Sequence, residues 1–410
     1  MEDTARGPAR HPGRAAGDSR GTNMRICGLL CTVLFAVLAA GPALAVPEYA
    51  VVTGSGGGAG AAYLISVDGS SLDIVSSVSV GSDLRGVAAY GDRAYVADYA
   101  NNKLHVLRMS SSGSTFLLES LTSVGTGSGP TDVAVGDAYA YVANSYQGNL
   151  SRIDTSTYAV NSVNSSPVVS PQSLAMYDAI DHNLVVGAQN ATGVGRIARV
   201  SGTTWGQLDT TDVGFDFGYP RQVAVGWTGT VARSYLAAWW AGTGSGSGGI
   251  VVMDPASGKA VGNASSLSSG FMPTGVSVVG SGPSWSLAVA GYDSSNDAYL
   301  RRYALDANGA VSDTPSASYS LGSGMVHRIA RSASGNYLFV TSSDGQTLVN
   351  VFDVSGTSWT LVGSVSAGGV YGWGVAAIGE AGAIPEPSSL AALCVGLGGM
   401  LGALRRLRHK

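Results

Sequence analysis

A short strand-like motif recurs along the chain, and its spacing is the feature that most constrains the fold. Each copy is five residues long and ends in an aliphatic residue followed by Ala or Ser, and four copies begin with Pro. The seven copies are 84–88, 130–134, 171–175, 220–224, 273–277, 326–330 and 372–376. Their starts lie 41 to 53 residues apart, which is the period expected for the four-stranded blades of a β-propeller.

The best-preserved unit is Pro130–Asp154. Its first apolar run alternates with period two and ends at a turn, Gly136–Asp137. A second run over Tyr139–Ala143 is followed by a polar loop, Asn144–Asn149, and a third run ends at Asp154. This alternation between turn residues predicts short antiparallel strands, because successive side chains of a strand point to opposite faces.

Similar runs follow the other copies of the motif. Second strands are predicted at 94–97, 139–143, 184–187, 235–238, 286–290 and 337–341, and third strands at 103–108, 150–154, 249–254, 299–305 and 348–354. The seventh copy has no room for further strands, whereas Tyr49–Thr53, Ala61–Asp68 and Leu72–Val78 resemble second, third and fourth strands. We therefore predict that Gly374–Ile378 pairs with Tyr49–Thr53 and closes the ring.

The composition agrees with many short strands. Gly accounts for 59 of the 410 residues and charged residues for 12%, and Gly supplies the positive φ angles of tight turns. A disordered Gly-rich chain is the alternative, but 45% hydrophobic residues are enough to bury a large core. The predicted fold class is all-β, with a seven-bladed propeller at 46–383; a pair of β-sandwiches or a β-helix is the competing interpretation.

One unit also resembles a known repeat. YVAN at 141–144 followed by NLSRID at 149–154 resembles the YVTN-type β-propeller repeat, and YVAD at 95–98 and LFVTSS at 338–343 are degraded versions. The resemblance implies a seven-bladed propeller. The chain departs from the pattern at Trp239 and Trp240, which replace the Asn.

The N-terminal region indicates export. Residues 1–23 lack periodicity, and we interpret them as an over-extended, non-native start, with a long n-region as the alternative. Residues 24–45 have the order of a secretory signal peptide: basic Arg25, apolar Ile26–Ala40, and an A-x-A cleavage site at Ala43 and Ala45. An uncleaved helical anchor is less favoured because the apolar region is short for a bilayer.

The C-terminal region combines three features in a fixed order. Pro385, Glu386 and Pro387 precede an apolar stretch, Ser389–Leu404, and a basic end, Arg405–Lys410. Residues 384–410 therefore resemble the PEP-CTERM sorting signal of Gram-negative bacteria, with a single transmembrane helix. The resemblance implies an exosortase-type membrane transpeptidase as partner. It also implies transient anchoring in the inner membrane and a final place in the cell envelope, at the surface or in the extracellular matrix. A permanent single-span anchor is the alternative.

Cysteine and charge exclude several functions. Cys27 and Cys31 lie in the signal peptide and Cys394 in the C-terminal stretch, so residues 46–383 contain no Cys. Disulfides, thiol catalysis and Cys-bound metals are therefore not expected in the propeller. Residues 46–383 carry 14 Lys and Arg against 23 Asp and Glu, a net charge of −9, which disfavours nucleic acid as a partner.

No catalytic, metal or cofactor motif is found in the propeller region. The sequence lacks H-E-x-x-H, G-x-S-x-G and EF-hand patterns. His105 is expected inside a strand and His182 in a solvated turn. The loose acidic groups 293–297 and 209–216 are interpreted as turns, since Asp and Asn favour turns.

One constellation suggests a binding site. In an antiparallel meander, the residues entering each first strand share a face with the loops between second and third strands. This places aromatic, Arg and Gln side chains at the channel mouth, which suits a carbohydrate or other polar ligand. The candidate ligand-binding residues are Arg85, Asp132, Gln172, Arg221, Trp239, Trp240, His327 and Trp373. The alternative is a merely solvated mouth with the Trp side chains packed between blades.

Two functions are weighed on this basis. The first is a non-catalytic binding or scaffold module at the cell surface or in the matrix, with exopolysaccharide or a surface protein as partner. The second is a secreted propeller hydrolase or lactonase with its site at the channel mouth. The mouth counts against the second, because such enzymes use a carboxylate-rich, metal-binding pocket and Asp132 is the one acid expected there.

Overall fold

The computed structural model describes residues 47–378 except 113–114, 163–168, 179–181, 190–193, 203, 205–206, 213–217, 229–230, 241–246, 262–264, 268–269 and 281–284. All regular elements in these ranges are strands or turns. Within them, no helix has the length and apolar character needed to cross a membrane. The predicted signal peptide with Ala43 and Ala45, and the predicted sorting signal with Pro385, Glu386 and Pro387, lie outside the described residues.

The strands form seven antiparallel sheets in the described part of the chain, which confirms the predicted seven-bladed propeller and excludes a sandwich or β-helix. From the channel outward, three sheets are β29 (Tyr371–Ile378), β1 (Glu48–Gly56), β2 (Ala59–Asp68), β3 (Ser71–Ser79); β4 (Leu84–Tyr90), β5 (Arg93–Asp98), β6 (Lys103–Ser112), β7 (Thr115–Gly125); and β8 (Pro130–Val135), β9 (Tyr139–Asn144), β10 (Asn149–Asp154), β11 (Val160–Ser162). The next two are β12 (Pro171–Asp178), β13 (Asn183–Gln189), β14 (Gly195–Ser201), β15 (Gln207–Asp212); and β16 (Gly218–Thr228), β17 (Val231–Trp240), β18 (Ser247–Asp254), β19 (Lys259–Ala260), with β20 (Ser265–Ser266) also on β18. The last two are β21 (Met272–Val279), β22 (Ser286–Tyr292), β23 (Asp297–Ala304), β24 (Ala317–Ser323); and β25 (Val326–Arg331), β26 (Tyr337–Ser342), β27 (Val349–Asp353), β28 (Thr360–Val365).

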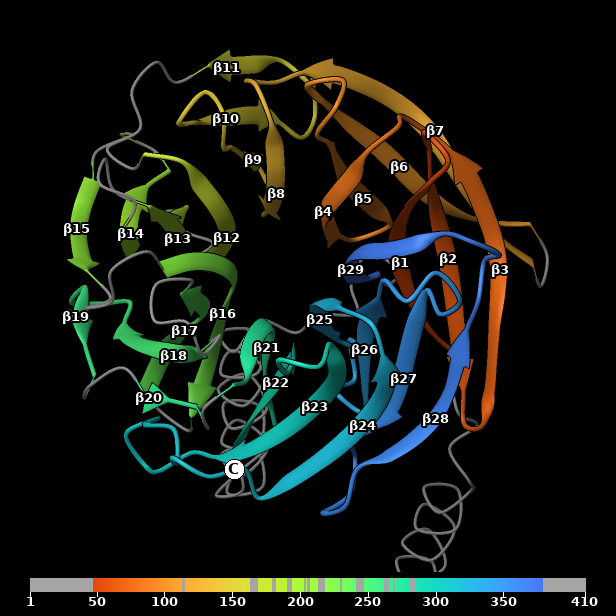
Figure 1. Cartoon of the computed structure of the whole chain (residues 1–410). Coiled ribbons are helices and arrows are strands. Elements are labelled where there is room, and N and C mark those ends of the chain that lie inside the picture. Colours follow the sequence, from red (N-terminus) through yellow and green to blue (C-terminus); the bar gives the residue numbers. More distant parts are fainter. Residues whose placement is uncertain are drawn as a thin grey trace, which may run out of the picture. The chain divides into compact units, whose positions relative to one another are not determined.

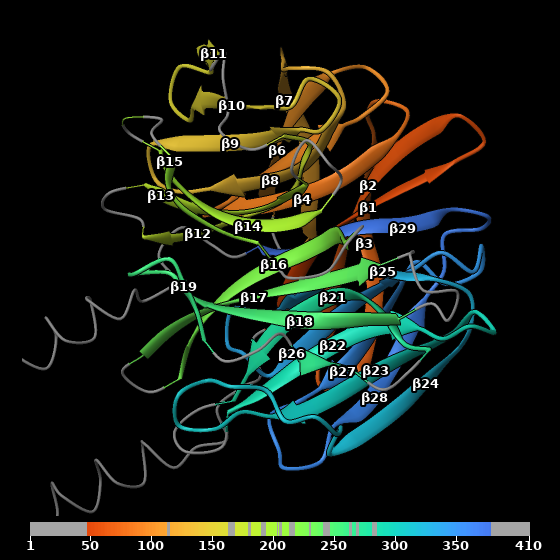
Figure 2. The same cartoon turned by 60° about the vertical axis from the view of Figure 1, so that its left-hand side comes forward.

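The first strands of the sheets surround a common channel. Each of β4, β8, β12, β16, β21, β25 and β29 contacts the next one in the series, and β29 contacts β4, so the ring is closed. Figure 1 looks along the channel with these strands innermost, and Figure 2 shows the ring obliquely. All seven predicted motif copies begin at or within a channel strand.

The ring closes as predicted, through a sheet built from both ends of the propeller. β1 pairs with β29 in antiparallel register, with Tyr49 opposite Ile378 and Thr53 opposite Gly374. The Thr53 hydroxyl is fully buried, donates to the Arg85 carbonyl at 2.7 Å and accepts from the Gly374 N–H at 2.8 Å. The Thr53 hydroxyl therefore links the two strands of the closing sheet and also joins this sheet to the neighbouring one.

The hydrophobic core is divided among the blade interfaces. Seven clusters of buried apolar side chains occur in the described residues, and each is formed by two neighbouring sheets. In β5, Ala94 and Val96 pack toward one neighbour, whereas Tyr95 and Ala97 pack toward the other. Both faces of a second strand are therefore buried, which explains why these strands are apolar throughout.

Candidate functional site

Each channel strand carries an irregularity at the same end of the ring. The pairing with the second strand shifts between Leu84 and Val87 in β4, and an equivalent shift occurs in the other six blades. The side chains left without a ladder partner at these β-bulges are Arg85, Thr131, Gln172, Arg221, Thr274, His327, Arg328 and Trp373. A bulge redirects a side chain out of the regular alternation, so the propeller directs these groups to one place.

That place is a cavity of about 290 Å³ at the channel mouth. Its lining contains all eight of these bulge residues, together with Gly86, Pro220, Tyr292 and Met325. Of the candidate ligand-binding residues, Arg85, Gln172, Arg221, His327 and Trp373 line this cavity. Asp132 lines a second, smaller cavity, the Trp239 ring contacts Arg221 but is not part of the lining, and the Trp240 side chain lies outside the described residues.

Arg85 belongs to a series of contacting cationic and aromatic groups. Its guanidinium carbon lies 3.3 Å from the centre of the Tyr99 ring and 5.6 Å from that of Trp373, and its Nη2 pairs with Asp83 Oδ2 at 3.1 Å. Tyr99 in turn contacts Tyr146 at a ring-centre distance of 5.2 Å, and the Tyr146 side chain is 74% exposed. The series therefore runs from the solvent-exposed rim to the mouth.

Arg221 stands on another blade, at the border of the same cavity. Its guanidinium carbon lies 5.3 Å from the Trp239 ring centre, and Trp239 contacts Tyr219, whose side chain is 41% exposed. Arg221 is exposed and lines the cavity. Burial, and then the positive charges of Arg328 and Arg85, lower the pKa of Arg221 from its ordinary value.

His327 is held as a neutral ring. It stacks on Trp373 with ring centres 4.1 Å apart. Desolvation and the charges of Arg221, Arg328 and Arg85 lower the pKa of His327 to about 3. The imidazole therefore carries no charge at neutral pH, because the environment penalises the protonated form.

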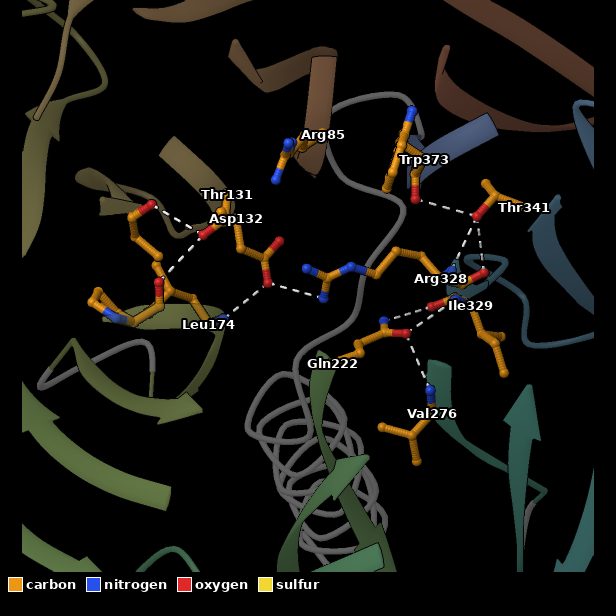
Figure 3. A network of polar contacts seen from close by, with 12 residues as sticks. Arg85, Thr131, Asp132, Leu174, Gln222, Val276, Arg328, Ile329, Thr341 and Trp373 are labelled. Atoms are coloured by element: carbon orange, nitrogen blue, oxygen red, sulfur yellow. Dashed lines mark hydrogen bonds and ion pairs between the residues drawn. The ribbon is translucent and has the colours of Figure 1, made fainter. Parts of the chain in front are cut away.

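An ion pair forms the floor of the mouth (Figure 3). Arg328 reaches from β25 to Asp132 on β8, with Nη1 at 3.1 Å from Oδ2, and the same oxygen accepts the Leu174 N–H at 2.9 Å. Asp132 is 6% exposed, and burial raises its pKa despite the attraction of Arg328. Asp132 thus supports the site from below, next to a small second cavity of about 70 Å³.

The Gln222 side chain also forms hydrogen bonds between neighbouring blades at the channel. Its side-chain oxygen accepts the N–H groups of Val276 at 3.1 Å and Ile329 at 3.0 Å, and its Nε2 donates to the Ile329 carbonyl at 2.9 Å. Sequence reasoning missed Gln222 and the bridging role of Arg328. A signal existed, because Gln222 follows Pro220 by two residues as Asp132 follows Pro130.

Gly86 makes room for this floor. A Cβ atom at Gly86 would lie 2.5 Å from Asp132 Cα and Oδ1, and 2.7 Å from the Thr131 carbonyl oxygen. Only a residue without a side chain fits such an approach of two strands. The close approach of these two strands therefore explains why this copy of the motif has a glycine at position 86.

The other polar residues considered from the sequence lie in turns or inside blades. His105 is 8% exposed and its Nε2 lies 3.1 Å from Asp98 Oδ2 in the same sheet. His182 was expected to be solvated, but it is half-buried with its ring against Tyr139. Asp293 Oδ1 accepts the N–H groups of Ser295 and Asp297, as in a turn. In the described residues no three His, Cys, Asp or Glu side chains are grouped as metal ligands.

Comparisons with known proteins agree with the fold. A family model of the LVIVD repeat matches residues 81–120, which span the blade from β4 into β7. A search of curated proteins gave no match. The YVTN-type resemblance of 141–154 remains a prediction.

Solved structures give the same architecture. A putative 6-phosphogluconolactonase from Bacteroides fragilis has a TM-score of 0.57 at 13% identity, covering 80% of this chain and 97% of its own. A putative 6-phosphogluconolactonase from Bacteroides uniformis has a TM-score of 0.55 at 14% identity, covering 79% and 98%. At such identities the likeness shows the propeller fold alone.

Proposed function

We propose that this chain is an exported, non-catalytic binding module whose propeller holds a polar extracellular ligand, such as exopolysaccharide, at the channel mouth. The observation that carries the proposal is the convergence of bulged side chains from all seven blades on one cavity. Guanidinium, amide and hydroxyl groups offer directed hydrogen bonds to sugar hydroxyls, and aromatic rings offer stacking surface. Each blade supplies at least one of these groups.

The rim extends the contact area beyond the cavity. Tyr146 and Tyr219 are exposed aromatic residues near the mouth, linked to it through Tyr99 and Trp239. A polymer chain can contact such rim residues while one unit occupies the cavity. This arrangement favours a long ligand over a free monosaccharide.

Binding to polysaccharide tests the proposal. The protein is added to extracted matrix or a glycan array, and the retained fraction is compared for the parent chain, Trp373→Ala and Arg221→Ala. Both variants are expected to lose at least tenfold in affinity, because each removes a group from the cavity. Arg108→Ala is the matched control, since Arg108 is 52% exposed and pairs with Asp92. Equal retention of all four proteins would refute the proposal.

Sorting at the C-terminus is a separate proposal that rests on the motif at 384–410. Export through residues 24–45 followed by exosortase processing would carry the propeller from the inner membrane to the envelope or matrix. Changing Pro385, Glu386 and Pro387 together to Ala is expected to stop release, whereas Ser388→Ala is not. Processing is measured by mass spectrometry and release by cell fractionation. Unchanged processing of the triple variant would contradict the sorting proposal.

The hydrolase or lactonase alternative lacks a supporting observation. The described lining of the mouth contains no carboxylate, and Asp132 below it is buried against Arg328. The named lactonase structures share the fold at identities too low to transfer an activity. We therefore do not advance it as a second function.

A further inference from the structure

The three guanidinium groups of the mouth differ in how their charge is balanced. Arg85 pairs with Asp83, and Arg328 pairs with Asp132. Arg221 pairs with no carboxylate among the described residues, and its guanidinium lies 5.3 Å from the centre of the Trp239 ring. The mouth therefore holds one positive charge that the described part of the protein does not compensate.

The surroundings of Arg221 make this more than an ordinary surface arginine. The charge of an isolated arginine on a flat surface is screened by water and salt. Arg221 instead lines a cavity together with two other guanidiniums, and burial and then their positive charges lower its pKa. A recess lined by one sign of charge concentrates the opposite sign, although residues 46–383 as a whole are acidic.

The neutral groups of the mouth are compatible with an anion. His327 is uncharged at neutral pH and lies beside Arg221, and its Nε2 is buried without a hydrogen-bond partner in the described structure. Gln172 and Thr274 place further polar groups in the lining. In the described lining no acidic side chain is present to repel an incoming carboxylate.

We infer that the mouth selects an anionic substituent of its ligand, a carboxylate or sulfate group on a polysaccharide, and that Arg221 contacts it directly. The inference rests on the proposed binding function and adds the chemical class of the ligand. The planar fork of the guanidinium matches both oxygens of a carboxylate or sulfate. Arg85 and Arg328 supply positive potential at longer range, because each is already engaged with an aspartate.

A pair of polymers that differ only in charge tests the inference. The full chain, purified in detergent, is measured by biolayer interferometry against polygalacturonate and against the same polymer fully methyl-esterified. Dextran sulfate and neutral dextran form a second pair, which distinguishes sulfate from carboxylate. We expect at least tenfold tighter binding to one charged polymer than to its neutral counterpart, since hydrogen bonds to charged groups are the strong ones.

Two variants separate a specific contact from general attraction. Arg221→Gln is expected to reduce binding of the charged polymer at least tenfold and to leave the neutral one unchanged, and Arg221→Lys is expected to fall between. Arg108→Gln, at an exposed arginine outside the mouth, removes the same charge and should have no effect. Circular dichroism checks that each variant is folded.

The outcomes are distinguishable. Equal binding of charged and neutral polymers, or equal losses for Arg221→Gln and Arg108→Gln, overturns the inference and leaves the proposed binding function standing. No binding of any polymer by the parent chain overturns both. A tenfold preference that Arg221→Gln alone abolishes supports the inference.

Discussion

Removing Asp132 should destabilise the propeller, because it leaves two groups of the channel floor without a partner. Its Oδ2 accepts from Arg328 at 3.1 Å and from the Leu174 N–H at 2.9 Å. The Asp132 residue is 6% exposed and the Arg328 side chain 14% exposed. Asp132→Ala therefore deprives a buried guanidinium of its counter-charge and a buried N–H of its acceptor.

Breaking a buried pair from one side costs about 3–5 kcal/mol. We expect the lower end, about 3 kcal/mol, because Arg328 also borders the mouth cavity and can keep part of its hydration there. This is a large share of the roughly 5–15 kcal/mol of net stability usual for a folded protein. The loss should therefore be visible without preventing folding.

Urea unfolding followed by tryptophan fluorescence measures the effect. Asp313→Ala is the matched control, since Asp313 is exposed, and it should stay within about 0.5 kcal/mol of the parent. The double variant Asp132→Ala with Arg328→Met should lose less than the sum of the single variants, by about 1 kcal/mol or more. A loss below about 0.5 kcal/mol for Asp132→Ala, or strictly additive losses, would refute the reasoning.

Three further predictions concern the same ring. The pKa of His327 is about 3, below its ordinary 6.5, so between these values the unfolded chain binds a proton that the folded chain does not, and stability falls as the pH falls through that window. His327→Phe should reduce the loss between pH 7 and 4 by about 1–3 kcal/mol in thermal melts; an unchanged pH profile would contradict this. Gly86→Ala should cost about 1–3 kcal/mol by overpacking against Asp132. Gly125→Ala is the control and should be nearly neutral, because nothing lies within 4 Å of the added Cβ. Equal urea midpoints for the two variants would exclude the steric argument. Thr53→Val removes the hydrogen bonds of the hydroxyl to the Gly374 N–H in the closing sheet and to the Arg85 carbonyl in the neighbouring sheet. It should cost about 1–3 kcal/mol, which a urea midpoint equal to that of the parent would disprove.

The blade pattern was accessible from the sequence because it depends on local alternation. Second strands such as Tyr139–Asn144 are bounded by turns, and the spacing of the motif copies predicted the number of blades. Closure was also predictable, since the seventh copy had one possible partner. The paired residues, Thr53 and Gly374 among them, are those expected.

The roles of the mouth residues were less predictable. The sequence placed Asp132 in the same set as Arg221, but one is buried beneath the cavity and the other is open to it. The contact of Asp132 with Arg328 joins positions 196 residues apart in the chain, so no local pattern could reveal it. The low pKa of His327 likewise comes first from burial and then from Arg221 and Arg85 on other blades and Arg328 beside it.

The sequence by itself therefore determined the repeat, the number of blades, the strand that closes the ring and five of the residues that line the channel mouth. These follow from period-two alternation and from spacing, which are properties of neighbouring residues. The tertiary structure alone decided which arginines pair with a carboxylate, which residues form the floor and which arginine has no such partner among the described residues. Those outcomes depend on the distances between side chains from separate blades, and electrostatic energies change steeply with distance and burial.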